Sequence, residues 1–192
     1  MSGLRVFVAV PVSGQVRQEI FALQRKLAAE VGPTIRWTKP EQIHLTLRFL
    51  GNVPDENIAD LRQALDRACL GAAPIEISLS DLGCFPSRRR PRIVWLGVSN
   101  GANELTDLAE RVRAETAMFG DSTDSKPFVP HLTIGRSKDP RSSDGHVGEI
   151  ICRENPRQIG LLRVSEVHLV KSELSRSGSN YSIIACHPLK RK

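Results

Sequence analysis

A four-residue motif occurs twice in this chain, and it limits how the chain can fold more than any other feature. The segment His44-Leu45-Thr46-Leu47 recurs 87 residues further on as His131-Leu132-Thr133-Ile134. Each copy lies in a stretch typical of a β-strand, where residues i and i+2 point to the same face. In each copy the histidine and the threonine therefore share a face, while the intervening apolar residues point into a core. Two such strands side by side would present two imidazoles and two hydroxyls to one cleft.

This set of side chains suits the hydrolysis of a phosphodiester. Histidine has an unperturbed pKa close enough to neutrality to act as either a general base or a general acid. One neutral imidazole can take a proton from the attacking water, and one imidazolium can give a proton to the departing ribose oxygen. The hydroxyls of Thr46 and Thr133 can donate hydrogen bonds to the nonbridging phosphate oxygens. No carboxylate cluster accompanies the histidines, so we expect no metal in the site.

The repetition distinguishes this motif from a chance pattern. A single His-x-Thr tripeptide in a strand is most simply structural. Here two nearly identical copies each follow a proline-containing segment, and we therefore interpret His44 and His131 as functional. His168 lacks the threonine two positions on and is interpreted as structural, and His146 and His187 are assigned no role.

The order of the expected elements favours an α+β fold. Apolar and β-branched runs predict strands at about 4–10, 35–37, 43–50, 75–79, 93–98, 132–135, 160–170 and 181–187. Apolar residues three or four apart predict helices at about 13–30, from 54 to beyond 68, and at 103–118. Short strands mixed with helices argue for mostly antiparallel sheet in one domain spanning residues 1–192. The polar segment 137–148 is expected to be a mobile loop.

Composition places the chain among ordinary globular proteins. It has 192 residues, of which 40% are hydrophobic and 25% charged. A formal net charge of +6 makes a polyanion such as RNA a candidate partner. The four cysteines show neither a C-x-x-C pair nor zinc-ligand spacing, which indicates reduced thiols in a cytoplasmic protein. The short apolar run near the N-terminus fits neither a signal peptide nor a membrane span. We therefore expect a cytoplasmic monomer without a membrane partner.

Arginines near the motifs could take part in binding. Arg136 follows the second motif, but strand alternation turns it to the other face unless the strand ends or twists at Gly135. A phosphate-binding role and a solvated strand end are then equally good interpretations. Arg48 continues the alternation of the first motif and either lines the cleft or lies on the surface. Residues 85–92 contain four arginines and are expected to form a basic loop, which either contacts RNA phosphates or is simply solvated.

With their flanking residues, the paired motifs resemble the two-histidine (2H) phosphoesterase superfamily, which is defined by paired H-x-[ST]-x motifs. Within it, the chain looks like the RNA 2′,3′-cyclic phosphodiesterases, also called LigT/ThpR-type 2′-5′ RNA ligases. The resemblance covers nearly the whole chain. Around the first motif, the matching segments are residues 5–10, Trp37 and 48–51. Pro130 and residues 135–136 flank the second motif. Phe85-Pro86, residues 91–97 and residues 169–174 also match.

The resemblance implies two pseudo-symmetric lobes of mostly antiparallel sheet with outer helices around a central cleft. It implies that RNA with a 2′,3′-cyclic phosphate terminus is hydrolysed to a 2′-phosphate without a cofactor, with a reversible 2′-5′ ligation of RNA halves as an accompanying reaction. Carried onto this chain, it makes His44 the general acid that protonates the leaving O3′ and His131 the general base that activates water. Thr46, Thr133 and Arg136 would bind the phosphate.

Three alternatives remain open from the sequence. A related phosphodiesterase could act on small cyclic nucleotides or on 2′-5′ oligoadenylate. A noncatalytic RNA-binding module could keep the fold, although two complete motifs argue against it. A metal-dependent hydrolase could use His44 and His131 as ligands, but the sequence offers them no carboxylate or cysteine partner.

Overall fold

Nine strands and four α-helices make up the described chain. The computed structural model describes residues 3–121, 127–139, 145–154, 158–175 and 178–191. The strands are β1 (Gly3–Pro11), β2 (Ile35–Trp37), β3 (His44–Pro54), β4 (Ile75–Ser87), β5 (Arg90–Asn100), β6 (His131–Ser137), β7 (Gly160–Val164), β8 (Glu166–Ser175) and β9 (Gly178–Pro188). The helices are α1 (Gly14–Val31), α2 (Ile58–Cys69), α3 (Ala102–Glu115) and α4 (Gly145–Arg153), with single 3₁₀ turns at Gly32–Thr34, Pro40–Gln42 and Asp55–Asn57.

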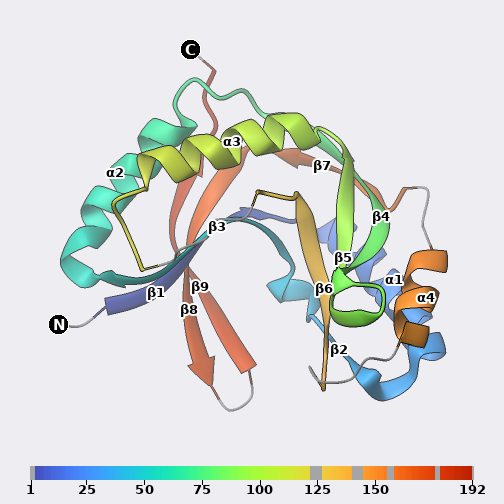
Figure 1. The fold of residues 1–192 in the computed structure, drawn as a ribbon. Helices are drawn as coiled ribbons and strands as arrows, with labels where there is room; N and C mark the ends of the chain where they lie inside the picture. Colours follow the sequence, from blue (N-terminus) through green and yellow to red (C-terminus); the bar gives the residue numbers. More distant parts are fainter. Residues whose placement is uncertain (1–2, 122–126, 140–144, 155–157, 176–177, 192) are drawn as a thin grey trace.

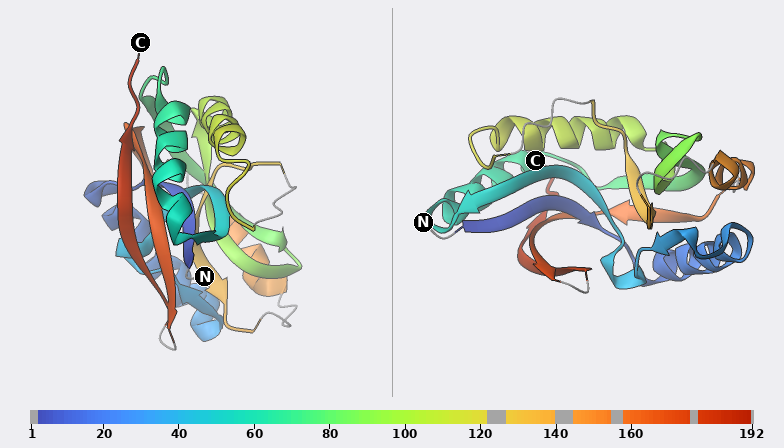
Figure 2. Two further views of the ribbon diagram at one scale, coloured as in Figure 1. Left: turned by 90° about the vertical axis from the view of Figure 1, so that its left-hand side faces the viewer. Right: turned by 60° about the horizontal axis from the view of Figure 1, so that its bottom comes forward.

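The strands form one curled sheet in the order β7-β4-β5-β6-β3-β1-β8-β9, with β2 also paired to β6 (Figure 1). Every pairing between these strands is antiparallel. The sheet has two halves, β7-β4-β5-β6 together with β2 and β3-β1-β8-β9, which meet where β6 pairs with β3. Helices α1 and α4 accompany the first half, whereas α2 and α3 lie side by side against the second (Figures 1 and 2). The expected α+β fold with two lobes of antiparallel sheet is confirmed.

Local sequence explains where the first helix begins and ends. The hydroxyl of Ser13 accepts a hydrogen bond from the Val16 N–H at 3.4 Å, as an N-cap residue should. Buried residues at helical spacing, among them Ile20 and Leu27, hold the helix against the sheet. The helix ends at Gly32, whose φ of 65° is a conformation that glycine adopts easily.

Four expectations about the elements were wrong, each because long-range pairing decided the outcome. Strands β4 and β5 continue to Ser87 and Arg90, so the expected basic loop is the tight turn of a long hairpin. The single strand expected at 160–170 is divided into β7 and β8, and the stretch between it and the strand expected at 181–187 belongs to the hairpin of β8 and β9. Strand β3 also runs past Gly51 to Pro54.

The segment expected to be a mobile loop ends in a helix. Residues 140–144 lie outside the described part, but α4 begins at Gly145. Its apolar residues Val147, Ile150 and Ile151 are buried. It packs against β4 and β5, and this tertiary contact stabilises a helix too short to be evident from its sequence.

A single large core cluster extends through both halves of the sheet. A small separate cluster of Phe7, Ala9 and Val170 lies where β1 meets β8. Among the described helices, none combines the length and the apolar character that crossing a membrane requires.

Candidate active site

The two motifs lie on neighbouring strands. Strands β3 and β6 begin at His44 and His131, and they pair through the residues that follow, Leu45 and Leu132. Both leucines are fully buried, so the histidine and threonine of each motif project from the opposite face. The antiparallel register sets each histidine beside the threonine of the other motif. We call this face of the sheet the site face.

Both imidazoles are oriented by the same kind of hydrogen bond. His44 Nδ1 lies 2.8 Å from the Gln42 carbonyl oxygen, and His131 Nδ1 lies 2.7 Å from the Val129 carbonyl oxygen. A carbonyl oxygen can only accept, so Nδ1 carries the hydrogen in both rings. Nε2 is then the nitrogen that accepts a proton when the ring is neutral and donates one when the ring is charged.

Burial lowers the pKa of both imidazoles. For His44, burial lowers the pKa to about 4, and the positive charge of Arg136 acts in the same direction. For His131, burial and Arg136 likewise lower the pKa. The hydrogen bonds to the backbone carbonyls oppose these shifts without cancelling them. Both rings are therefore mainly neutral near pH 7 in the free protein, and a bound anion would favour their protonation.

Arg136 shares the site face because β6 contains a bulge. Gly135 and Thr133 pair with consecutive residues of β5, so Ile134 is an extra residue between them. The bulge shifts the alternation by one position, with Ile134 and Gly135 both buried and Arg136 exposed. The charge of Arg136 acts on both imidazoles, which places the arginine with the motifs. Without the bulge, strand alternation would have pointed the Arg136 side chain to the opposite face of the sheet.

The hydroxyls of Thr46 and Thr133 are available to a ligand. Both residues are half-buried on the site face. Within the described ranges, neither side chain has a hydrogen-bond partner. Each hydroxyl can therefore donate to a phosphate oxygen without first breaking a protein contact.

Aromatic rings from distant strands surround His44. Phe7 of β1 stacks on the imidazole with ring centres 4.7 Å apart, and Tyr181 of β9 meets it edge-on at 5.4 Å. Phe49 lies 5.8 Å from Phe7. Phe7 is buried, whereas Phe49 and Tyr181 are 48% and 40% exposed. The buried ring desolvates the imidazole, and the exposed rings have the character of surfaces on which bases stack.

Aromatic rings also contact His131, from strands in the other half of the sheet. Phe85 of β4 meets its ring edge-on at 5.1 Å, and Trp95 of β5 lies at 6.4 Å. A Cβ at Gly83 would fall 2.1 Å from the Trp95 ring, so the glycine makes room for the indole. Sequence patterns gave no sign of the places of Phe7, Trp95 and Tyr181 beside the histidines, because long-range strand pairing puts them there.

Arg48 and the arginines of the β4–β5 hairpin lie outside the group formed by the two motifs and Arg136. Arg48 donates through Nη1 to the Arg113 carbonyl oxygen, at 3.0 Å, and to the Thr116 hydroxyl, so it ties β3 to the end of α3. Arg88 and Arg89 form the turn between β4 and β5, and Arg90 begins β5. That hairpin also carries Phe85 and Trp95, so the turn lies at the end of the strands that flank His131.

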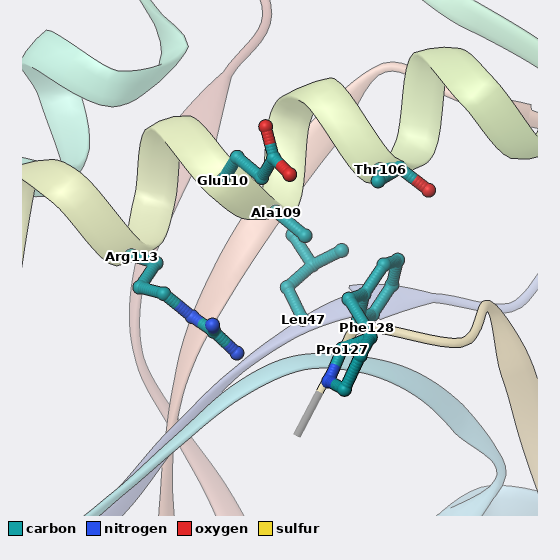
Figure 3. A pocket seen from close by; sticks show the side chains of 7 residues that line it. All are labelled: Leu47, Thr106, Ala109, Glu110, Arg113, Pro127 and Phe128. Atoms are coloured by element: carbon teal, nitrogen blue, oxygen red, sulfur yellow. The ribbon is translucent and has the colours of Figure 1, made fainter. Parts of the chain in front are cut away.

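A pocket lies between α3 and β3, and none of the motif histidines and threonines lines it (Figure 3). It has a volume of about 120 Å³ and is lined by Leu47, Pro127, Phe128 and four residues of α3. Leu47 is buried next to Thr46 along the strand, so it points away from the site face. This pocket therefore does not belong to the paired histidines.

Comparison with known proteins shows that two successive segments of the chain match one family. Residues 10–95 and 96–181 each match the family model described as LigT like Phosphoesterase, and each match contains one motif. An RNA 2′,3′-cyclic phosphodiesterase of Methanothermobacter thermautotrophicus is 34% identical over 93% of this chain and 95% of its own. A protein of the same name from Aquifex aeolicus is 30% identical over 96% of both chains.

Solved structures show the same fold. A crystal structure of a Thermus thermophilus protein superposes with a TM-score of 0.80 at 29% identity, over 96% of this chain and 97% of that one. E. coli LigT complexed with 3′-AMP gives a TM-score of 0.78 at 25% identity, over 98% and 99%. The fold and the paired motifs define an enzyme of the two-histidine phosphoesterase class. Since the family model matches both halves, the chain belongs to the LigT-like phosphoesterase family.

Proposed function

We propose that this protein hydrolyses the 2′,3′-cyclic phosphate at the end of an RNA to a 2′-phosphate. The observation that carries the proposal is the matched pair of imidazoles, each fixed through Nδ1 and each left with Nε2 for proton transfer. The name RNA 2′,3′-cyclic phosphodiesterase, carried by relatives that align over nearly the whole chain, supports this choice of substrate.

In the proposed reaction, His131 takes a proton from water as the water oxygen attacks phosphorus. Protonated His44 gives its proton to O3′ as the P–O3′ bond breaks. The products are a 2′-phosphomonoester and a free 3′-hydroxyl, and each histidine returns to its starting state by exchanging a proton with solvent. This division of roles follows the family resemblance, because the near-symmetric site treats the two rings alike. A 2′-5′ ligation would use the same groups in the same roles, with the 5′-hydroxyl of a second RNA attacking phosphorus in place of water.

Thr46, Thr133 and Arg136 would bind the phosphate. Two hydroxyl donors and a guanidinium match the nonbridging oxygens, whose negative charge grows as water adds. The bound phosphate would also raise the pKa of His44 from its value of about 4 in the free protein, which lets that ring carry the proton it must donate. Substrate binding and activation of the acid are thus one event in this proposal.

The proposed reaction uses neither a metal nor a cofactor. We further propose that residues 1–192 act as one bilobal domain and as a cytoplasmic monomer. All the proposed site residues come from a single chain, which supports a working monomer. The four cysteines are free, which supports a reducing compartment.

The test is hydrolysis of a short RNA with a 2′,3′-cyclic phosphate, measured in EDTA. Wild type should yield a 2′-phosphate, and His44→Ala and His131→Ala should each lower kcat by roughly 10²–10⁴-fold. His146→Ala, which alters an exposed histidine of α4, is the matched control and should keep full activity. Binding without turnover by wild type would instead indicate a noncatalytic RNA-binding module, and loss of activity in EDTA would indicate a metal-dependent reaction.

A substrate with sulfur in place of O3′ separates the two roles. Thiolate leaves without a proton, so this substrate should largely restore activity to His44→Ala. It should not restore His131→Ala, which lacks the base. If the substrate restored activity to His131→Ala and not to His44→Ala, His131 would be the acid and His44 the base. Comparing kcat/KM for the RNA with that for a cyclic mononucleotide, or with 2′-5′ oligoadenylate, would identify the preferred substrate.

A further inference from the structure

Three side chains with metal-ligating atoms gather away from the paired motifs. The ligand atoms of Glu166, His168 and Cys186 all lie within 4.8 Å of one another. His168 Nε2 is 2.8 Å from Glu166 Oε1. Glu166 and His168 are two residues apart on β8, and Cys186 of β9 pairs directly with His168. Strand geometry therefore turns all three toward the same face.

The donor set indicates which ion would fit. Imidazole nitrogen, thiolate sulfur and carboxylate oxygen are the ligands that Zn²⁺ takes in proteins, whereas Mg²⁺ and Ca²⁺ require oxygen ligands. Ligands of one tetrahedral zinc ion are roughly 3–4 Å apart, as metal–ligand distances of about 2.0–2.3 Å dictate. The observed separations need only small side-chain rotations to reach this geometry.

The exposure of the three side chains leaves room for an ion. The His168 side chain is 11% exposed and is therefore held in place, while that of Glu166 is 39% exposed and Cys186 lies at the surface. Three protein ligands on a rigid sheet, with solvent on one side, leave a fourth position for water.

We infer that Glu166, His168 and Cys186 bind a zinc ion that clamps β8 to β9. On binding, the Cys186 thiol loses its proton to solvent and its sulfur bonds to the metal. His168 lies opposite Ala9, and Ala9 lies opposite Thr46, so the clamp is on the site face. Two strand spacings of about 4.8 Å separate it from Thr46, so it is distinct from the phosphate site. It would fix the base of the hairpin that carries Tyr181.

The simpler role of the cluster is a hydrogen bond between Glu166 and His168. That contact does not involve the Cys186 thiol. Replacing Cys186 therefore distinguishes a zinc site from a simple contact between Glu166 and His168. Sequence spacing gave no hint of this site, because Cys186 becomes a neighbour of His168 only through the register of the hairpin.

The experiment is a titration of the metal-free full-length chain with Co²⁺, which reports thiolate ligation by an intense near-ultraviolet absorption band. Wild type should show this band at one ion per chain, and Zn²⁺ should displace it. Cys186→Ser should lose the band and bind Zn²⁺ at least roughly tenfold more weakly. Cys152→Ser, in the half-buried cysteine of α4, is the matched control and should keep both properties.

Zinc should also raise the Tm of wild type and of Cys152→Ser by several degrees, but not that of Cys186→Ser. Cys186 is exposed, so its replacement should leave the fold intact, and the Tm without metal checks this. A wild-type spectrum without the thiolate band, or a band that survives in Cys186→Ser, would overturn the inference. Neither result depends on the proposed hydrolysis, which is measured in EDTA.

Discussion

Among single residues, His44 and His131 have matching hydrogen bonds but different surroundings. His44 is stacked on a buried phenylalanine, and its pKa falls to about 4. In the unfolded chain the same imidazole would have its ordinary pKa near 6.5. Between these two values the unfolded state binds a proton that the folded state does not, so stability should decrease as the pH falls.

This gives a prediction for pH-dependent unfolding. The stabilisation from neutral His44 should be complete above pH 6.5 and be lost progressively down to about pH 4, by at most about 3 kcal/mol. Urea unfolding of wild type and His44→Ala at pH 7, 5.5 and 4 measures it. The variant should lose less stability over this range than wild type. Equal losses in wild type and His44→Ala would show that His44 is not the group responsible.

Gly135 is a second residue whose effect can be predicted. A Cβ there would lie 2.7 Å from Ile35 Cγ2 and 3.1 Å from the Trp37 ring. Gly135→Ala should reduce stability by about 1–3 kcal/mol through overpacking. It should also raise KM, because the displaced bulge reorients Arg136. Thermal unfolding and steady-state kinetics measure the two effects, and Gly14→Ala, with nothing within 4 Å of its added Cβ, is the control. An unchanged KM in Gly135→Ala would show that the bulge does not contribute to substrate binding.

Among the elements, the hairpin of β8 and β9 is linked to the active site by Gln42. The backbone carbonyl of this residue accepts the hydrogen bond from His44, while its side-chain Nε2 donates to the Ser179 carbonyl oxygen at 2.7 Å. One residue thus connects the imidazole to the hairpin whose Tyr181 contacts the same ring.

Gln42→Ala should therefore lower kcat/KM by roughly five- to tenfold, as expected for the loss of one hydrogen bond of about 1 kcal/mol that positions the hairpin. The Tm should change little, because the backbone carbonyl remains. Steady-state kinetics with the cyclic-phosphate RNA provide the measurement. Gln15→Ala is the matched control, since that amide donates to the Glu19 carboxylate at 3.3 Å in an exposed hydrogen bond within α1. Equal kinetics in both variants would mean that the hairpin needs no such anchor.

The elements were predictable from the sequence only where local patterns suffice. The first strand and helix lie close to their predicted bounds because alternation and the Ser13 cap are local signals. The length of β4 and β5 was not predictable, since charged residues near the turn join the strands through cross-strand hydrogen bonds. Helix α4 was missed because its stability comes from packing on that hairpin.

In the whole molecule, the two halves of the sheet meet at Leu45 and Leu132. Leu45→Ala should reduce stability by about 2–5 kcal/mol, like any such truncation in a core. It should also lower kcat at temperatures where the protein remains folded, because it loosens the contact that sets the two imidazoles side by side. Leu61→Ala, in an equally buried leucine of α2, should cause a similar stability loss without the kinetic effect. Urea unfolding and kcat at about 20 °C below each Tm are the measurements. Equal kcat values in the two variants would contradict this role.

The arrangement of the strands in the whole molecule explains which site residues could be predicted from the sequence. The paired motifs are visible because each strand carries its own histidine and threonine at positions i and i+2. Arg136 was ambiguous because a bulge is not encoded by alternation. The rings beside each histidine, and the cluster around Cys186, depend on strand order and register over long sequence separations.

The contact between β3 and β6 is one that duplication of a shorter chain can produce. Two successive segments match the same family model, and their motifs meet across one pair of equivalent leucines. An isologous contact of this kind is what two identical subunits form about a twofold axis. Duplication and fusion of a half-length ancestor would turn that dimer interface into the centre of a single chain. Once both copies lay in one gene, each histidine could acquire its own surroundings, and a symmetric pair could diverge into an acid and a base.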